Sequence, residues 1–266
     1  MTTLAPTGRA PRRYGLVGIL FLGFWIAVAA AMLLFLVGSF DLELIQRFAP
    51  AYLSGLWTTV SLVVLSFLIG AVLSVPIAFG RMASNAMARG ATFLYVSFFR
   101  GTPLITQIFL VYYGFGVFRE SFEAVGLWWF FREAWYCAIF SIALNTAAYQ
   151  AEILRGAIES VPKGQWEGGR SLGISRLVIF TRVVLPQAMI VALRPYANEI
   201  ILLIKASAIV AIITVFDLMG ETRRAYGRTF DFQTYIWAAL LYLAVVEVLR
   251  NATNIIEKRL TRHLVR

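Results

Sequence analysis

The chain has 266 residues, of which 60% are hydrophobic and only 14% are charged, and its mean hydropathy is +0.76. Such a composition excludes a soluble globular protein and predicts an all-α integral membrane protein in contact with membrane lipid. The net charge of +10 would indicate nucleic acid as the partner of a soluble protein, but basic residues of a membrane protein gather on its cytoplasmic side, so we expect no nucleic acid partner. Cys137 and His263 are the only residues of their types, which excludes an internal disulfide and a cysteine- or histidine-rich metal site.

The first apolar run covers residues 15–38 and follows a basic segment with Arg9, Arg12 and Arg13. A helix over this run would be about 36 Å long. That is too long for the core of a signal peptide, and the end of the run lacks a small-residue cleavage pattern. We therefore expect a cytoplasmic tail at residues 1–14, followed by an additional N-terminal transmembrane helix.

Five further apolar runs follow, each long enough for one crossing. They cover residues 48–80, 90–118, 134–151, 194–216 and 232–249. The runs lack the alternation of barrel strands, so only helices satisfy their backbone polar groups in lipid. The prediction is about six transmembrane helices, namely the N-terminal helix plus a five-helix core domain at residues 48–254, with a basic cytoplasmic tail at residues 255–266.

The run at residues 90–118 is divided by Arg100-Gly101-Thr102-Pro103. Thr102 is a suitable N-cap and Pro103 a suitable first helical residue. The crossing itself is therefore expected to begin there, after an interfacial stretch.

Lys and Arg side chains are unevenly distributed between the connecting segments. Most lie in segments that a cytoplasmic N-terminus places in the cytoplasm, and few lie on the other side. The positive-inside rule therefore predicts a multi-pass protein of the cell inner (cytoplasmic) membrane with both termini in the cytoplasm.

The longest cytoplasmic connection, residues 156–186, has the pattern of a structured segment. Residues 165–172 favour a short helix closed by Gly173, and Ser175 is placed to cap a second short helix that runs to Leu185. One narrow face of the first helix combines a large side chain with a site for close approach, and it is formed by Trp166, Gly169 and Leu172. Two interpretations stay open: docking into a groove of another subunit, or an amphipathic helix that rests on lipid headgroups.

The same loop resembles the EAA loop of the permease subunits of ATP-binding-cassette (ABC) importers. That loop has Glu-Ala-Ala, three residues, Gly, nine residues and Ile-x-Leu-Pro. This chain has Glu167-Gly168-Gly169, three residues, Gly173, nine residues and Val183-Val184-Leu185-Pro186. The chain departs at Gly168 and Gly169, where the family usually has alanine, and at Val183, where it has isoleucine. The resemblance implies that the permease couples to an ATPase through Glu167, Gly168, Gly169, Gly173, Leu185 and Pro186.

Three further segments resemble the polar amino acid branch of this family, close to its histidine and octopine permeases. They are Phe99-Arg100-Gly101-Thr102-Pro103-Leu104, the stretch from Leu144 to Ile153, and Asn198-Glu199-Ile200-Ile201-Leu202. The resemblance covers residues 50–262 and implies the transmembrane domain of a type I ABC importer for polar amino acids, of basic or opine type. It also implies three kinds of partner: a cytoplasmic ABC ATPase dimer, a second permease subunit that is a paralogue or an identical copy, and a periplasmic or extracellular amino-acid-binding protein.

The sequence contains no phosphate-binding loop of the pattern Gly-x-x-x-x-Gly-Lys-Ser/Thr. We therefore expect this chain to bind no cofactor and the partner subunit to use the ATP.

Polar residues at bilayer depth are costly, so they are candidates for function. Four such residues are assigned to the substrate pathway: Asn145, Tyr149, Glu199 and Lys205. Asn145 and Tyr149 lie four apart on one helix face, while Lys205 would meet an α-carboxylate and Glu199 an amine. Structural alternatives stay open, because Glu199 would also suit a pair with Arg194 or a gate against the partner permease, and Asn145 would suit a bond between helices.

An ion-coupled secondary transporter of small zwitterionic solutes is the alternative function, with Glu199 and Lys205 as coupling groups. It predicts two matching halves of inverted topology, which we do not find, and it leaves the structured loop without a role. A membrane enzyme is not expected, because no catalytic triad, metal-ligand spacing or carboxylate pair stands out.

Overall fold

The computed structural model describes residues 15–38, 41–260 and 262. It divides into two units, residues 1–47 and 48–266, which are described separately. The first unit contains α1 (Leu16–Gly38), the helix expected at residues 15–38, and the first turns of α2 (Leu42–Met82). The predicted tail at residues 1–14, His263 and the end of the predicted C-terminal tail lie outside the described residues.

α2 is one helix of 41 residues that begins before the predicted start at residue 48. Asp41 explains the early start, because its Oδ1 accepts hydrogen bonds from the backbone N–H groups of Glu43 (2.9 Å) and Leu44 (3.2 Å). A carboxylate in this position satisfies the first free N–H groups of a helix.

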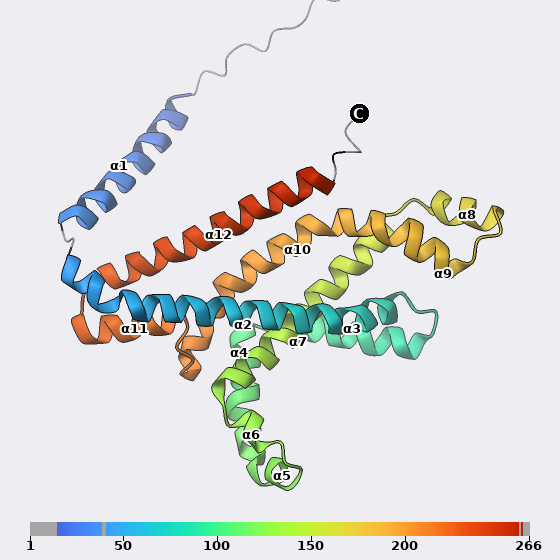
Figure 1. The fold of residues 1–266 in the computed structure, drawn as a ribbon, viewed down its shortest axis with the longest axis horizontal. Coiled ribbons are helices and arrows are strands. Elements are labelled where there is room, and N and C mark those ends of the chain that lie inside the picture. Colours follow the sequence, from blue (N-terminus) through green and yellow to red (C-terminus); the bar gives the residue numbers. More distant parts are fainter. Residues whose placement is uncertain (1–14, 39–40, 261, 263–266) are drawn as a thin grey trace, which may run out of the picture. The chain divides into compact units, whose positions relative to one another are not determined.

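The run at residues 90–118 lies in α3 (Ala86–Gly101) and in a second helical stretch that starts with α4 (Leu104–Phe109) and is bent from α3 by 106° (Figure 1). The prediction that Thr102 caps the second helix is wrong. Thr102 follows the last residue of α3, and its hydroxyl donates to the Phe98 carbonyl (2.8 Å). The N-cap position of α4 belongs to Pro103.

Short helical segments continue from α4 and lead to α7 (Ala134–Glu159). They are η1 (Leu110–Gly114), η2 (Phe115–Phe118), α5 (Arg119–Ala124) and α6 (Trp128–Phe131). In Figure 1 the stretch around α5 and α6 projects from the second unit. It is built on aromatic contacts such as Phe122 against Phe131, whose ring centroids lie 4.6 Å apart.

The rest of the second unit is also helical. It comprises α8 (Lys163–Ser171), α9 (Arg176–Ile179), η3 (Phe180–Val184), α10 (Leu185–Ser207), η4 (Ala208–Ile213), α11 (Leu218–Thr229) and α12 (Gln233–Leu260). Two helical stretches are longer than the predicted crossings. The fifth crossing, predicted at residues 194–216, lies in a continuous helical stretch Arg176–Ile213. The sixth continues past residue 249 to Leu260, so the predicted tail from residue 255 begins as helix.

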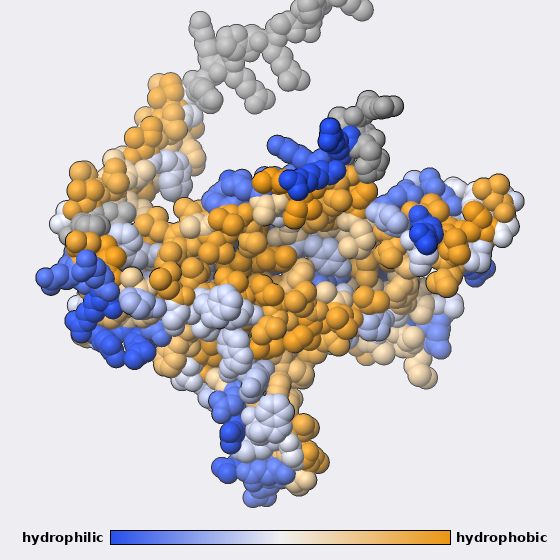
Figure 2. Space-filling view, viewed as in Figure 1, coloured by the Kyte–Doolittle hydropathy of each residue, from blue (hydrophilic) through white to orange (hydrophobic). Residues whose placement is uncertain are grey.

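Five helices of the described chain are long and apolar enough to cross a membrane, or six if the bent pair of α3 and the α4 stretch is one crossing. The prediction of an all-α protein with about six crossings is thus confirmed. Figure 2 shows the apolar surface that such helices present to lipid, with hydrophilic residues gathered toward the ends of the second unit.

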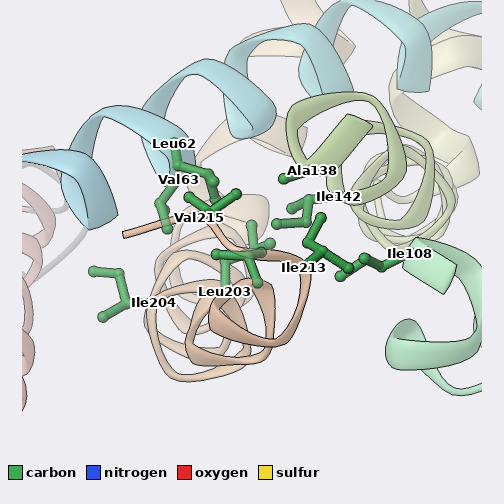
Figure 3. Packing of buried hydrophobic residues seen from close by; sticks show 10 residues of the cluster. Leu62, Val63, Ile108, Ala138, Ile142, Leu203, Ile204, Ile213 and Val215 are labelled. Carbon is green, nitrogen blue, oxygen red and sulfur yellow. The ribbon is translucent and has the colours of Figure 1, made fainter. Parts of the chain in front are cut away.

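The apolar core lies where α2, α4, α7 and α10 meet. Leu62 and Val63 of α2 face Ile142 of α7, and Leu203 of α10 and Ile213 of η4 close the cluster (Figure 3). A second cluster joins the other ends of α2 and α7 to α9 and α10 and includes Ala78, Ala151, Ile179 and Ala188.

Small residues allow α2 to approach α7 closely. A Cβ atom placed on Gly70 would lie 2.5 Å from Cγ2 of Thr146 and 3.1 Å from Nε2 of Gln150. Near this crossing, the Ser66 hydroxyl of α2 donates to the Ile139 carbonyl of α7 (3.4 Å). Small residues that let helix backbones approach are the usual basis of helix pairing in membranes.

The variant Gly70→Ala should therefore unfold more easily, by about 1–3 kcal/mol, as expected for overpacking. Gly90→Ala is the matched control, because a Cβ atom on Gly90 of α3 meets nothing within 4 Å; the usual gain of Ala over Gly in a helix is about 0.5–1 kcal/mol. Thermal unfolding of the protein in detergent measures both. Equal shifts in the two variants would contradict close packing at Gly70.

A second junction surrounds Asp217, which lies between the spans and is fully buried. Its Oδ1 accepts the Gly220 N–H (2.8 Å) and caps α11, and its Oδ2 accepts the Tyr242 hydroxyl of α12 (3.4 Å). The neighbouring Leu218 N–H donates to Oγ1 of Thr59 on α2 (3.0 Å). Burial raises the pKa of Asp217 to about 6, although these hydrogen bonds oppose the shift.

A raised pKa means that the folded protein holds this proton more tightly than the unfolded chain, in which the Asp pKa is about 3.9. Stability from this group is present at low pH and is lost as the pH rises from about 4 to about 6, by at most about 3 kcal/mol. Asp217→Asn keeps an oxygen to cap α11 but cannot ionise. Thermal unfolding between pH 4 and pH 7 should show a decline in the native protein relative to the variant, and parallel curves would refute the assignment.

Candidate functional site

Residues 156–186, the connection predicted to be cytoplasmic, contain a compact helical hairpin of α8, α9 and η3. α8 ends with Gly173 at a φ of +71°, and the N–H groups of Gly173 and Ile174 donate to the carbonyls of Arg170 (2.9 Å) and Gly169 (3.0 Å). This is the hydrogen-bond pattern of a helix end closed by a left-handed glycine. The predicted helix and its closure by Gly173 are confirmed, with Leu172 in the cap position itself.

The face of α8 that carries Trp166 and Gly169 packs within the hairpin. The Trp166 ring stacks on Phe180 of η3 (centroids 6.3 Å apart), and a Cβ atom on Gly169 would lie 2.7 Å from Cδ1 of the fully buried Ile179. The close approach expected at Gly169 is therefore made to the same chain. Leu172, the third residue of the predicted face, is 79% exposed.

The second half of the hairpin does not stop at the predicted end of the loop. α9 passes through η3 directly into α10, and Leu185 is the first residue of α10. Pro186 follows directly after the π-helical turn η3, and because it has no N–H it gives no hydrogen bond to that turn. The expectation of a separate helix that ends at Leu185 is wrong, because Arg176–Ile213 is one stretch.

The outward side of the hairpin carries polar and apolar groups together. Glu167 and Gly168 are exposed, and so is Leu177, with 71% of its surface accessible. In the part of the chain that the structure describes, the Glu167 carboxylate takes part in no ion pair. The hairpin projects from one end of the bundle (Figure 1), which makes this side accessible to a subunit.

An ion cluster joins three helices, α2, α3 and α7. Oε1 of Glu152 on α7 accepts from Nε of Arg81 on α2 (2.9 Å), and its Oε2 accepts from Nη2 of Arg155 (2.7 Å). Nη1 of Arg100 on α3 lies 4.0 Å from the same Oε2.

A seam of buried polar side chains crosses the bundle along α7. Nδ2 of Asn145 donates to the Phe99 carbonyl of α3 (2.9 Å) and to Oε1 of Gln107 on α4 (3.0 Å). Oγ1 of Thr146 donates to Oε1 of Glu199 on α10 (2.9 Å), and Nε2 of Gln150 donates to the Phe67 carbonyl of α2 (3.1 Å). Glu199 is only 7% exposed, so the seam holds a carboxylate at membrane depth.

The four predicted pathway residues are not all brought together. Asn145 and Glu199 both belong to the seam but have different partners, since Asn145 bonds α3 and α4 and Glu199 bonds Thr146. Tyr149 lies half-buried under the Arg100 guanidinium, 5.2 Å from it. Lys205 is exposed and makes no ion pair with any residue that the structure describes. The suggested pair of Glu199 with Arg194 is wrong, because Arg194 bonds Glu257 of α12 (2.7 Å).

Sequence reasoning missed Arg100, Gln107 and Gln150 as members of this region. Arg100 is the single charge in the run at residues 90–118, and that isolation was the available signal. The two glutamines stand in apolar helices, where an amide needs a partner from another helix.

Comparison with known proteins identifies the family of this chain. Residues 70–262 match the family of binding-protein-dependent transport system inner membrane components. The chain belongs to this family.

Several relatives are similar over most of their length. The chain is 40% identical to the nopaline transport system permease protein NocM of Agrobacterium fabrum, over 84% of this chain and 93% of that protein. It is 36% identical to the arginine ABC transporter permease protein ArtM of Haemophilus influenzae, over 80% of this chain and 94% of that protein. A chain in the crystal structure of an amino acid ABC transporter with histidines superposes with a TM-score of 0.72 and 30% identity, over 83% of this chain and 99% of the other.

As a member of the family, the chain is a permease subunit of an ABC importer and operates with ABC ATPase and permease partners. Its relatives are transporter components rather than enzymes. Membership in this family decides against the alternative function, an ion-coupled secondary transporter. Two regions of this permease contain the candidate site residues, namely the hairpin with the EAA-type spacing and the polar seam.

The two adjacent glycines of the hairpin should respond differently to alanine. Gly169→Ala would force Ile179 out of its buried position, whereas Gly168→Ala enters open space and favours the helix by about 0.5–1 kcal/mol. Hydrogen exchange of residues 163–180 should become faster in the first variant and not in the second. Adding Ile179→Ala to Gly169→Ala should restore part of the protection. Equal protection in both single variants would contradict the packing of α8 on α9.

Proposed function

We propose that this chain is the membrane-spanning permease subunit of an importer for polar amino acids that carry a guanidinium group, of the basic or opine type. The names of similar proteins support this class, since nopaline, octopine and arginine appear among them. All three molecules combine a guanidinium group with a carboxylate, so a pathway for them needs a buried anion and a donor for an anion.

The observation that carries the proposal is the buried carboxylate of Glu199. Its side chain accepts a hydrogen bond from Thr146 and makes no ion pair with another described residue. A guanidinium stays charged at every physiological pH, and a charge at membrane depth requires an opposite charge or a set of hydrogen bonds. Glu199 meets this need for a guanidinium, and Asn145 supplies an amide in the same seam.

The partners proposed are a cytoplasmic ABC ATPase dimer, a second permease that is a paralogue or an identical copy, and an external amino-acid-binding protein. The ATPase would bind the outward side of the α8–α9 hairpin, where Glu167, Leu172 and Leu177 are accessible. The ATPase would also hold the ATP, and this chain would hold no cofactor. The distribution of Lys and Arg supports an inner-membrane location with both termini in the cytoplasm.

Uptake of labelled arginine and octopine into vesicles that contain the permease, its ATPase and its binding protein tests the proposal. Native protein should take up these two compounds in preference to glutamate. Glu199→Gln should raise the KM for arginine about tenfold or more, as expected for the loss of a charged partner. Glu247→Gln is the control, because this α12 carboxylate is partly exposed and paired with Arg250, and it should leave the KM unchanged.

Uptake of glutamate but not of arginine or octopine would refute the proposed cargo. Uptake of arginine with the same KM in Glu199→Gln and in the native protein would remove Glu199 from the pathway.

A further inference from the structure

The break between α3 and α4 is held by side-chain amides. Nε2 of Gln107 donates to the carbonyls of Phe99 (3.0 Å) and Thr102 (3.1 Å) and to Oγ1 of Thr102 (2.8 Å). Nδ2 of Asn145 on α7 also donates to the Phe99 carbonyl (2.9 Å). Free carbonyls at a helix end cannot stay unbonded in lipid, and these bonds satisfy them. The last turn of α3, which carries Arg100, is therefore tied to α4 and α7.

The Arg100 guanidinium lies on an aromatic ring and remains accessible. Its Cζ is 5.2 Å from the centroid of Tyr149, four residues after Asn145 on α7. A ring under a guanidinium attracts it and holds its plane without using its N–H donors. The Arg100 side chain is 44% exposed, so these donors can reach a molecule outside the bundle.

Among the described residues, Arg100 is the one guanidinium of its ion cluster without a short ion pair, and its charge also acts on the buried Glu199 carboxylate. The described members of the cluster are three guanidinium groups and two carboxylates: Arg81, Arg100, Arg155, Glu152 and Glu159. Glu152 bonds Arg81 and Arg155 at 2.9 and 2.7 Å, and Glu159 bonds Arg155 at 2.6 Å. Arg100 reaches Glu152 only at 4.0 Å. It is the most exposed and the least paired of the three cations, with side-chain accessibilities of 18% for Arg81 and 28% for Arg155.

We propose that Arg100 binds the α-carboxylate of the transported amino acid. Its planar fork suits two parallel N–H bonds to a carboxylate, Tyr149 holds the fork in place, and its charge, without a short ion pair, attracts the anion. The inference rests on the proposed function, in which Glu199 receives the guanidinium end. It assigns to Arg100 the role that the sequence suggested for Lys205, which is exposed on α10 outside the seam.

Kinetics of arginine uptake by Arg100→Lys and Arg100→Gln test the proposal in the complete transporter. Arg100→Gln should raise the KM about tenfold or more, and Arg100→Lys should raise it less, because it keeps the charge but loses the fork. Stimulation of ATP hydrolysis by the binding protein should persist in both variants. Arg155→Gln is the matched control in the same cluster: it removes both close bonds of Arg155 and should lower thermal stability without a comparable change in KM.

A second measurement identifies the carboxylate directly. In the purified permease and ATPase complex without the binding protein, unlabelled arginine should displace labelled arginine from the native protein far better than agmatine, which lacks the carboxylate. In Arg100→Gln this preference should shrink about tenfold or more.

The outcomes separate the two proposals. Native transporter that fails to take up arginine contradicts the proposed function itself. Native uptake of arginine with an unchanged KM in Arg100→Gln, or an equal rise in Arg155→Gln, overturns the role of Arg100 alone. An unchanged preference for arginine over agmatine in Arg100→Gln does the same.

Discussion

Polar groups at membrane depth must find partners inside the protein, because lipid offers none in place of water. In this bundle α7 supplies most of them: Asn145 binds α3 and α4, Thr146 binds α10, and Gln150 binds α2. The same hydrogen bonds that join α7 to four other helices also place Glu199 in the interior. Helix packing and the candidate pathway therefore depend on one set of side chains. The small residue Gly70 lets α2 come close enough to α7 to contact this set.

Much of the fold could be predicted from the sequence because the bilayer imposes a minimum apolar length on every crossing. The runs at residues 15–38 and 134–151 correspond to α1 and α7, and Gly173 closes α8 as its spacing indicates. The ends of helices were harder to predict from the sequence. Asp41 starts α2 early by a local cap, and α10 extends back through the π-helical turn η3 into α9 even though Pro186 lies at the junction.

The candidate site was predictable only in part. The cost of polarity in lipid indicated Asn145, Tyr149 and Glu199 from the sequence, and the structure gathers these three around the end of α3 and the seam. The sequence could not indicate which helix face each residue occupies, and Lys205 lies on an exposed face of α10. Nor could it show that Trp166 and Gly169 pack on their own hairpin, since Phe180 and Ile179 come into contact with them only when α8 folds back.

The unbroken stretch Arg176–Ile213 has a mechanical consequence. The helical path from the hairpin to Glu199 is continuous, and its two natural bending points are the π-helical turn η3 and Pro195 within α10. Glu199 is 14 residues, or about 21 Å, beyond the start of α10. Rotation of α10 about its own axis would carry the carboxylate away from the Thr146 hydroxyl, so that a movement of the hairpin passed on through these points would change the polar contacts of Glu199.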